Sequence, residues 1–235
     1  MRDNSNHIAL WPDSHNILPI NQTQIWLVNL DLDAELIAEL GQTLSPDECA
    51  RADRFHSATD RSRFIAARGS LRAVLGDALN IAPSVVPLTY TPHKKPVLAD
   101  ENSLRFNVSH SDSLALIAVT QGREIGIDLE YLRTDFDADA LAKRFFSPQE
   151  YAALSQTPLP EKHPAFLAYW TCKEAYLKAI GSGLNCPLKN FAVSLADFSI
   201  LLVGPNGDGR KTAPYRLMPF TPSPGYVAAL VLEIP

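Results

Sequence analysis

One helix-start motif occurs twice in the chain, and this repetition limits the possible folds more than any other feature of the sequence. A Ser-Pro-x-Glu motif begins at Ser45, and a second one begins at Ser147. In both, serine can cap the helix, proline fits the first helical position, and glutamate completes a capping box. The chain is therefore expected to contain two similar units, unless the match is a coincidence of common capping residues.

The segments that follow the two motifs are also alike. A long helical region is expected from Ser45 to Gly76, and a second helix over Thr171–Gly181; both carry basic residues and end in glycine. Each helix precedes a strand that reads Phe-x-Val-Ser, at 106–109 and 191–194. We therefore expect an α+β fold in which two similar α+β halves pack face to face around a ligand cleft.

Further elements and the division between the halves follow from local patterns. Strands are expected at 24–30, 104–109, 114–120 and 124–132, and a short helix at 33–40. The Asp- and Ala-containing stretch 133–139 has the composition of a connector. The N-terminal half would then span residues 1–132 and the C-terminal half residues 133–235, with the active site at their interface.

Composition excludes several classes of protein. Of the 235 residues, 46% are apolar and 20% are charged, which is ordinary for a soluble globular chain. The three cysteines form no Cys-x-x-Cys pair, the first residues are polar, and no apolar stretch is long enough to span a bilayer. We expect a cytoplasmic protein without a membrane segment. A formal net charge of −5 argues against a general nucleic-acid binder.

The segment 124–130 alternates strictly between apolar and other residues. Its period of two puts Asp128 and Glu130 on one face of a strand, about 7 Å apart. Two carboxylates on one face repel each other unless a cation or a shared proton lies between them. A set of only two or three carboxylates suits Mg²⁺, which keeps several waters and takes further ligands from phosphates. The alternative is an ordinary solvated strand face.

Two further groups of residues could bind phosphate. Glu174 and Lys178 are four residues apart on one helix face; they could form a surface ion pair, or supply a third carboxylate and a phosphate contact. Ser109 and His110 end a strand, where they could donate to a phosphate or simply close a turn. A cluster of basic residues that includes Arg51 lies upstream of these groups. The alternative for this cluster is an ordinary solvated helix face.

Taken together, three motifs in this order resemble the 4′-phosphopantetheinyl transferase superfamily, in its surfactin-synthetase-type branch. They are Gly126-Ile-Asp-Leu-Glu130, then Phe145-Phe-Ser-Pro-Gln-Glu150, then Trp170-x-x-Lys-Glu-Ala-x-x-Lys178. Asn107-Val-Ser-His-Ser111 and the Lys95-Pro96 pair also match. The resemblance covers most of the chain from Leu44 to Val203, and it implies two halves related by a pseudo-two-fold axis.

The resemblance also implies a reaction. The 4′-phosphopantetheine arm of coenzyme A would move to a serine of an apo acyl or peptidyl carrier protein, and 3′,5′-ADP would leave. By matching motif positions, Asp128, Glu130 and Glu174 would hold Mg²⁺. Glu174, or a water that it orients, would take the serine proton, and Lys178 would stabilise charge on the phosphates. The expected coenzyme A contacts are Arg51, Arg68, Lys95, Ser109, His110 and Lys178.

The chain departs from the family at two positions. A basic residue is common where Glu48 stands, and Gly-Lys-Pro is common where this chain has Lys94-Lys95-Pro96. With Glu48 in place of a basic residue, the 3′-phosphate contact is expected to rely more on Arg51 and Arg68. Lys94 in place of glycine affects the backbone conformation of the turn.

The sequence leaves open more than one partner surface and more than one function. A basic and apolar surface at Lys143, Arg144, Phe145 and Phe146 is expected to meet an acidic carrier, although at least one of the phenylalanines should be in the core. Because two fused halves already form a cleft, a monomer is expected. The alternative functions are a non-catalytic coenzyme A or carrier-protein binding module and a Mg²⁺-dependent nucleotide diphosphate hydrolase.

Overall fold

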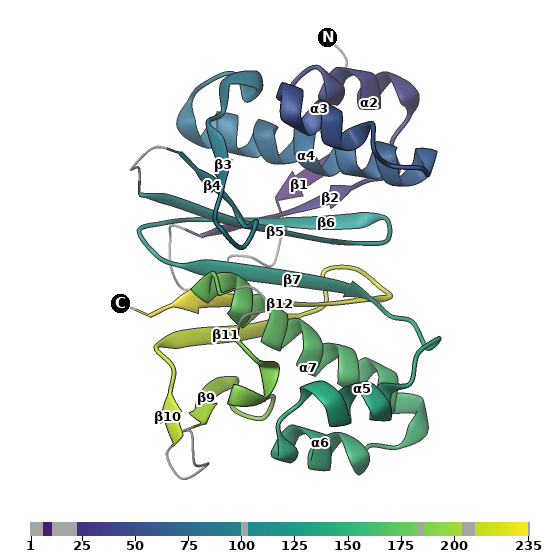
Figure 1. Ribbon diagram of the computed structural model, residues 1–235, viewed down its shortest axis with the longest axis vertical. Helices are drawn as coiled ribbons and strands as arrows, with labels where there is room; N and C mark the ends of the chain where they lie inside the picture. Colours follow the sequence, from purple (N-terminus) through teal and green to yellow (C-terminus); the bar gives the residue numbers. More distant parts are fainter. Residues whose placement is uncertain (1–6, 11–22, 100–102, 183–185, 204–209, 235) are drawn as a thin grey trace.

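Helices cover the two outer faces of a pair of central sheets (Figure 1). The structure is a computed structural model that describes residues 7–10, 23–99, 103–182, 186–203 and 210–234. The N-terminal elements are β1 (Ile8–Leu10), β2 (Gln24–Asn29), α2 (Ala34–Gly41), α3 (Pro46–Ala52), α4 (Ala58–Leu79), η2 (Pro83–Val85), β3 (Leu88–Tyr90), β4 (Pro96–Leu98), β5 (Leu104–Ser111) and β6 (Leu114–Gln121).

The second set of elements follows a similar order, with three strands instead of two between its 3-10 helix and its last two strands. It consists of β7 (Ile125–Tyr131), α5 (Ala138–Phe145), α6 (Pro148–Ser155), α7 (Leu159–Ile180), η4 (Leu188–Asn190), β8 (Phe191–Ser194), β9 (Ser199–Val203), β10 (Arg210–Thr212), β11 (Tyr215–Phe220) and β12 (Tyr226–Glu233). None of the helices in these ranges is long and apolar enough to cross a membrane.

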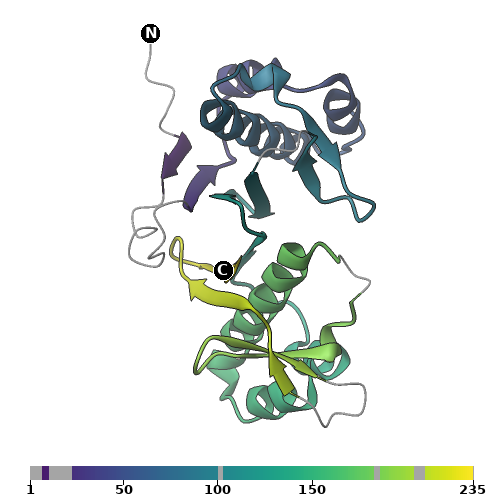
Figure 2. The same cartoon turned by 90° about the vertical axis from the view of Figure 1, so that its left-hand side faces the viewer.

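Sheet topology confirms two similar α+β halves. In the first sheet the strand order is β1-β2-β6-β5, and in the second it is β11-β12-β7. Apart from the added β1, each sheet places the last strand of its half between the first and the next-to-last. In each half three helices follow the first strand, and the longest, α4 or α7, has 22 residues. Figure 2 shows the two halves above and below the central strands.

Three clusters of the hydrophobic core follow this arrangement. One cluster joins the facing sheets, with Ile25 and Leu116 from the first and Ile127 and Leu230 from the second. A second cluster packs α4 on the first sheet, and a third packs α7 on the second sheet. The alternation of β7 explains its place, because Ile125, Ile127 and Leu129 all enter the cluster between the sheets.

Two sequence predictions are corrected by the fold. The expected helix from Ser45 to Gly76 is two helices, α3 and α4, and α4 continues past Gly76 to a left-handed cap at Asn80. The two Phe-x-Val-Ser segments are not equivalent, because β5 lies in a central sheet whereas β8 pairs with β9 in a separate one. β7, which lies before the expected division at residue 132, forms its backbone ladder with β12.

Both capping boxes form, and each glutamate also binds a cation from the long helix of its half. Ser147 caps α6, and Glu150 Oε2 accepts a bond of 2.7 Å from the Ser147 backbone N–H. The same carboxylate accepts two bonds of 2.8 Å from Lys173 Nζ and one of 2.8 Å from the Val193 backbone N–H. Lys173 donates a further bond to the Phe191 carbonyl, so the buried ion pair ties α6, α7 and β8 together.

The first half contains the counterpart of this pair. Glu48 completes the box with Ser45 and accepts a bond of 2.6 Å from Arg72 Nε on α4. Arg72 also donates to the carbonyls of Pro83 and Val86 in the segment after α4. The same three parts, a short capped helix, the long helix and the segment after it, are therefore joined in each half.

Removal of one partner from such a pair is expected to be strongly destabilising. Lys173→Ala leaves the Glu150 carboxylate charged and buried without its cation, which costs about 3–5 kcal/mol of unfolding free energy. Lys162→Ala, which breaks a half-exposed pair with Asp139, costs less than about 1 kcal/mol. Urea unfolding of both variants checks the contrast; equal small losses would show that the Lys173 pair is not a structural tie.

Candidate active site

The second face of β7 carries the acidic residues, as its alternation predicts, and this face packs on α7. Gly126 leads the row and lies against the α7 backbone: a Cβ there would come 2.0 Å from the Ala175 carbonyl oxygen and 2.4 Å from the Ala179 nitrogen. A larger residue would hold the helix away from the strand. The absence of a side chain at Gly126 therefore sets the distance between Asp128 on β7 and the polar residues of α7.

A three-residue contact joins the two halves next to this strand. Lys178 Nζ, from α7, lies 2.7 Å from Asp128 Oδ1 and donates a bond of 2.9 Å to Ser109 Oγ on β5. Ser109 in turn donates to Asp128 Oδ1 at 2.9 Å. The alternative of a surface ion pair between Glu174 and Lys178 is thus not the arrangement found, because the lysine pairs with Asp128 on the neighbouring strand.

Side chains of β5 replace a backbone ladder between β5 and β7. Asn107 Oδ1 accepts a bond of 2.8 Å from the Ile127 N–H, and Ser111 Oγ accepts one of 3.0 Å from the Tyr131 N–H. Ser111 also donates to Glu130 Oε2 at 3.1 Å. Since residues at alternate positions of a strand share a face, Asn107, Ser109 and Ser111 can all meet β7. The sequence carries no local signal for this role of Asn107 and Ser111, although both lie in the 107–111 motif.

Glu174 is half-buried on α7, close to the same carboxylates. Burial of its side chain raises its pKa to about 7, and the negative charges of Asp128 and Glu130 add to this effect, while Lys178 opposes it. The pKa of Glu130 is raised as well, by burial and by Asp128. β7 and α7 therefore bring the carboxylates of Asp128, Glu130 and Glu174 close enough to repel one another. Their negative charge is only partly balanced by Lys178.

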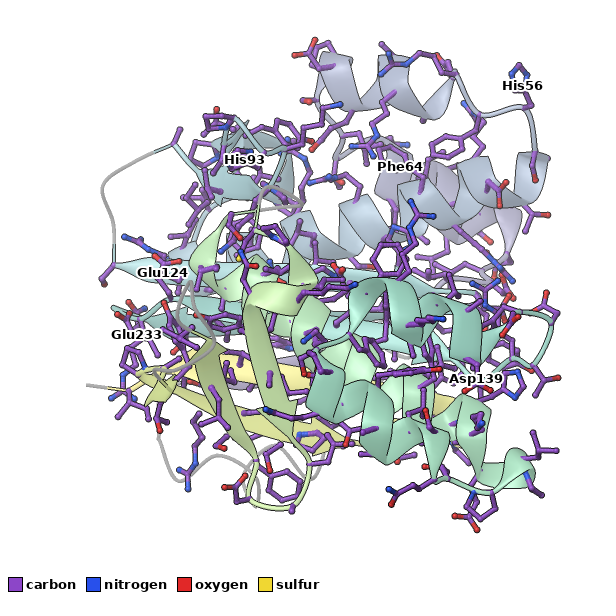
Figure 3. All side chains as sticks on the ribbon, turned by 60° about the horizontal axis from the view of Figure 1, so that its bottom comes forward. His56, Phe64, His93, Glu124, Asp139 and Glu233 are labelled. Atoms are coloured by element: carbon purple, nitrogen blue, oxygen red, sulfur yellow. The ribbon has the colours of Figure 1, made fainter. Side chains whose placement is uncertain are left out.

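Two adjoining cavities run from this point along the first half. The first encloses about 300 Å³ and is lined by Glu174, Lys178, Lys95 and Asn107, among others. The second encloses about 160 Å³ between α4 and the β3–β4 hairpin. Figure 3 labels His93 in the hairpin, which lines the first cavity, and Phe64 on α4, which lines the second. Val108 and Pro96 line both cavities, so the two adjoin.

The second cavity gathers the other expected contacts. Arg51, Arg68 and His110 all line it. Arg68 is buried, and its Nη1 has no hydrogen-bond partner among the described residues. Desolvation lowers the pKa of Arg68, and desolvation together with the positive charges of Lys178 and Arg51 lowers that of His110. Arg68 Nε lies 3.5 Å from Glu48 Oε1, so the free Nη1 is the part of this buried guanidinium that is suited to an anion.

Comparison with known proteins agrees with this architecture. The 4′-phosphopantetheinyl transferase superfamily model matches residues 124–231, and a model of the N-terminal part of such transferases matches residues 33–122. The 4′-phosphopantetheinyl transferase HetI of Nostoc sp. is 43% identical over 90% of this chain and 88% of its own. The chain belongs to the 4′-phosphopantetheinyl transferase superfamily. It is therefore a transferase.

Other members of the superfamily are more distant. A putative 4′-phosphopantetheinyl transferase of Synechocystis sp. is 39% identical over 70% of this chain and 67% of its own. The 4′-phosphopantetheinyl transferase Sfp of Bacillus subtilis is 28% identical over 82% of this chain and 83% of its own. The holo-acyl-carrier-protein synthase of Thermotoga maritima aligns with a TM-score of 0.33 and 18% identity, over 47% of this chain and 62% of that chain.

One test of a metal ion in this transferase is whether its residues have unused coordinating atoms. Asp128 is buried, and its Oδ2 has no hydrogen-bond partner among the described residues. Within the same residues no group of three His, Cys, Asp or Glu side chains stands ready to hold a metal. The free Oδ2 and the high pKa of Glu174 nevertheless fit a divalent cation, which would neutralise the repulsion among the carboxylates.

The remaining predicted residues lie at the edges of this transferase site. Lys95 Nζ lies 3.5 Å from the Ile125 carbonyl oxygen and 3.6 Å from Glu124, and burial lowers its pKa. In Figure 3 Glu124 is labelled at the same end of the sheets as Glu233, which accepts a bond of 3.0 Å from the Glu124 N–H. Lys95 thus connects the hairpin to the start of β7.

The predicted carrier surface on α5 is only partly exposed. Lys143 and Arg144 are exposed, whereas Phe146 is buried in the core beneath α5. Phe145 is half-buried and packs edge-on against Trp170 at 5.8 Å between ring centroids. The prediction that at least one of the two phenylalanines belongs to the core is confirmed.

Proposed function

We propose that this transferase moves 4′-phosphopantetheine from coenzyme A to a serine of an apo acyl or peptidyl carrier protein, with release of 3′,5′-ADP. The observation that carries the proposal is the Lys178–Asp128–Ser109 contact beside Glu174, at the head of a cavity that continues to Arg51 and Arg68. Coenzyme A carries a diphosphate and, at its adenosine end, a further phosphate. The cations along the two cavities match this distribution of negative charge.

The chain's own residues have distinct parts in the proposed step. The serine oxygen of the carrier forms a bond to the phosphorus next to the pantetheine, and the bond from that phosphorus to the bridging oxygen breaks. Glu174 takes the serine proton, since a carboxyl with a pKa near 7 is matched to base catalysis at neutral pH. Lys178 donates to the phosphate oxygens on which charge develops.

A Mg²⁺ ion is proposed to be held by Asp128, Glu130 and Glu174. The unpaired Asp128 Oδ2 supports this part of the proposal. When bound, the ion would neutralise diphosphate charge that otherwise repels the nucleophile. Arg51, Arg68 and His110 would hold the adenosine end, and Lys95 and Ser109 would line the path between the two ends.

Three further parts of the proposal concern organisation. The two halves divide between Gly122 and Ile125, which is supported by the pairing of β7 with β12 and by the family matches that meet there. The active site lies at the interface of the halves. The chain acts as a cytoplasmic monomer, and the exposed cations Lys143 and Arg144 meet an acidic carrier.

One incubation series tests the reaction and its alternatives. The protein is incubated with coenzyme A and Mg²⁺, with and without an apo carrier protein, and the products are analysed by mass spectrometry. A carrier that gains one phosphopantetheine, with 3′,5′-ADP formed only when it is present, is the expected result. Hydrolysis of coenzyme A without a carrier would identify a diphosphate hydrolase, and no product with any carrier would identify a binding module; either overturns the proposal.

The metal ligands are tested by Asp128→Ala in the same assay. We expect transfer to fall at least about 100-fold while circular dichroism remains that of the wild type, because the loss removes both a metal ligand and the partner of Lys178. Lys189→Ala, at an exposed lysine outside the site, serves as the control and should retain wild-type transfer. Full activity in Asp128→Ala would refute the assigned site.

A further inference from the structure

Lys94 has a backbone conformation that ordinarily belongs to glycine. Its φ is +64°, in the left-handed region that residues with a Cβ disfavour. The residue lies in the five-residue loop of the β3–β4 hairpin, where Tyr90 pairs with Pro96. The Lys94 N–H donates to the Thr91 carbonyl at 2.8 Å, so the loop holds this conformation by its own hydrogen bonds. A strained residue kept in a binding region calls for a functional explanation.

The Lys94 side chain stands where three cavities meet. It lines the cavity of Glu174 and Lys178, the cavity of Arg68 and His110, and a third of about 640 Å³ at the start of α3. The side chain is exposed, and no salt bridge joins it to any residue that the structure describes. Its neighbour Lys95, in contrast, lies near Glu124. The Lys94 ammonium is therefore available to a ligand.

The opposite wall of the third cavity offers few cations of its own. Glu48, on α3, lines it with a carboxylate, which Arg72 neutralises at 2.6 Å and Arg68 approaches at 3.5 Å. Arg51 and Arg54 are the other cations of that wall. Arg51 and Lys94 line both this cavity and the second one, from opposite sides, so an anion between them would meet positive charge on two sides.

We propose that Lys94 is a substrate-binding residue that contacts the terminal 3′-phosphate of the adenosine end, opposite Arg51, and so helps the site to select coenzyme A over its 3′-dephospho form. The hairpin thereby supplies a cation that the Glu48 position on α3 does not. This inference rests on the proposed function, since it takes coenzyme A as the ligand. Phosphate binding by the Lys94 side chain would explain why the chain keeps a left-handed conformation at this position.

Three substitutions separate the charge of Lys94 from its backbone conformation. Lys94→Gly relieves the left-handed strain and removes the ammonium, Lys94→Asn removes the ammonium with a residue that tolerates this conformation, and Lys94→Arg keeps the charge. Lys189→Asn, at an exposed lysine of η4 outside the site, matches the change in net charge. Isothermal titration with coenzyme A and with 3′-dephospho-coenzyme A, at two salt concentrations, gives the dissociation constants.

The expected results have opposite signs for stability and binding. Lys94→Gly should raise the melting temperature by about 2–4 °C. Lys94→Gly and Lys94→Asn should each weaken coenzyme A binding by about 5–10-fold, with a shallower salt dependence, and should leave 3′-dephospho-coenzyme A binding unchanged. Lys94→Arg and Lys189→Asn should bind as the wild type does.

Two outcomes would overturn the inference while the proposed function stands. Wild-type coenzyme A affinity in both Lys94→Gly and Lys94→Asn would show that the ammonium contacts no phosphate. An equal loss for coenzyme A and its 3′-dephospho form would place the contact at the diphosphate instead. Failure of the wild-type protein to bind coenzyme A at all would instead overturn the proposed function, which the titration of the wild type detects first.

Discussion

Glu174→Gln should lose at least about 1000-fold in phosphopantetheine transfer and, in the absence of metal, gain stability at pH 8. The activity falls because the amide neither accepts the serine proton nor binds a divalent cation as a carboxylate does. Transfer to an apo carrier at saturating coenzyme A measures this loss. Glu161→Gln, on the first turn of the same helix, serves as the control and should leave transfer unchanged.

The stability gain follows from the pKa of about 7 that burial and nearby carboxylates give Glu174 in the folded protein. In the unfolded chain the pKa is near the ordinary value of 4.5. Between pH 4.5 and 7 the folded state binds more protons than the unfolded state, so stability falls as pH rises through this range. Above pH 7 the charged carboxylate costs the wild type about 3 kcal/mol, which the glutamine variant avoids.

Urea unfolding in a chelator at pH 4.5 and pH 8 measures this difference. The variant and the wild type should be about equally stable at pH 4.5, and the variant more stable at pH 8. Added Mg²⁺ should stabilise the wild type at pH 8 and have little effect on the variant. A variant that is less stable than the wild type at pH 8 would show that Glu174 is not under repulsion from Asp128 and Glu130.

Gly126→Ala should disrupt the site although it replaces no polar side chain. Its Cβ would come 2.0 Å from the Ala175 carbonyl oxygen and 2.4 Å from the Ala179 nitrogen, and both are backbone atoms of α7 that cannot rotate away. The helix must move off the strand, which we expect to cost about 3 kcal/mol or more. Because Glu174 and Lys178 move with the helix, transfer should also fall about 100-fold.

Gly41→Ala provides the matched control for this substitution. A Cβ at Gly41 would meet only Ile65 Cγ2, at 3.8 Å, which is an ordinary contact. Gly41 is the last residue of α2, so alanine there should be neutral or slightly stabilising. Urea unfolding and transfer assays on both variants check the pair. A Gly126→Ala protein with wild-type stability would show that close packing of α7 on β7 is not required.

The position of the acidic residues on β7 was predictable because it depends on strand geometry alone. A strand has a period of two in any fold, so Asp128 and Glu130 share a face once 124–130 is identified as a strand. The capping boxes at Ser45 and Ser147 were equally local, since they need only neighbouring backbone and side-chain atoms. Both features were therefore present in the sequence before any tertiary contact formed.

The internal repeat was only partly predictable for the same reason. The capped helix starts were real signals, and they mark equivalent helices in the two halves. The Phe-x-Val-Ser segments were not, because which strand pairs with which is decided by hydrogen bonds between distant segments. The cations opposite Glu48 and Glu150 differ in type, so the equivalence of Arg72 and Lys173 became visible only through their contacts.

Local sequence patterns were enough to indicate which residues could carry chemistry and which of them lie together on one strand or one helix. The pairing of Lys178 with Asp128 and Ser109 rather than with Glu174, and the left-handed conformation of Lys94 between three cavities, became apparent only in the folded chain. The difference lies in the range of the interactions. Period and capping follow from neighbouring residues, whereas the partner of a charge and the close approach at Gly126 depend on how distant segments pack.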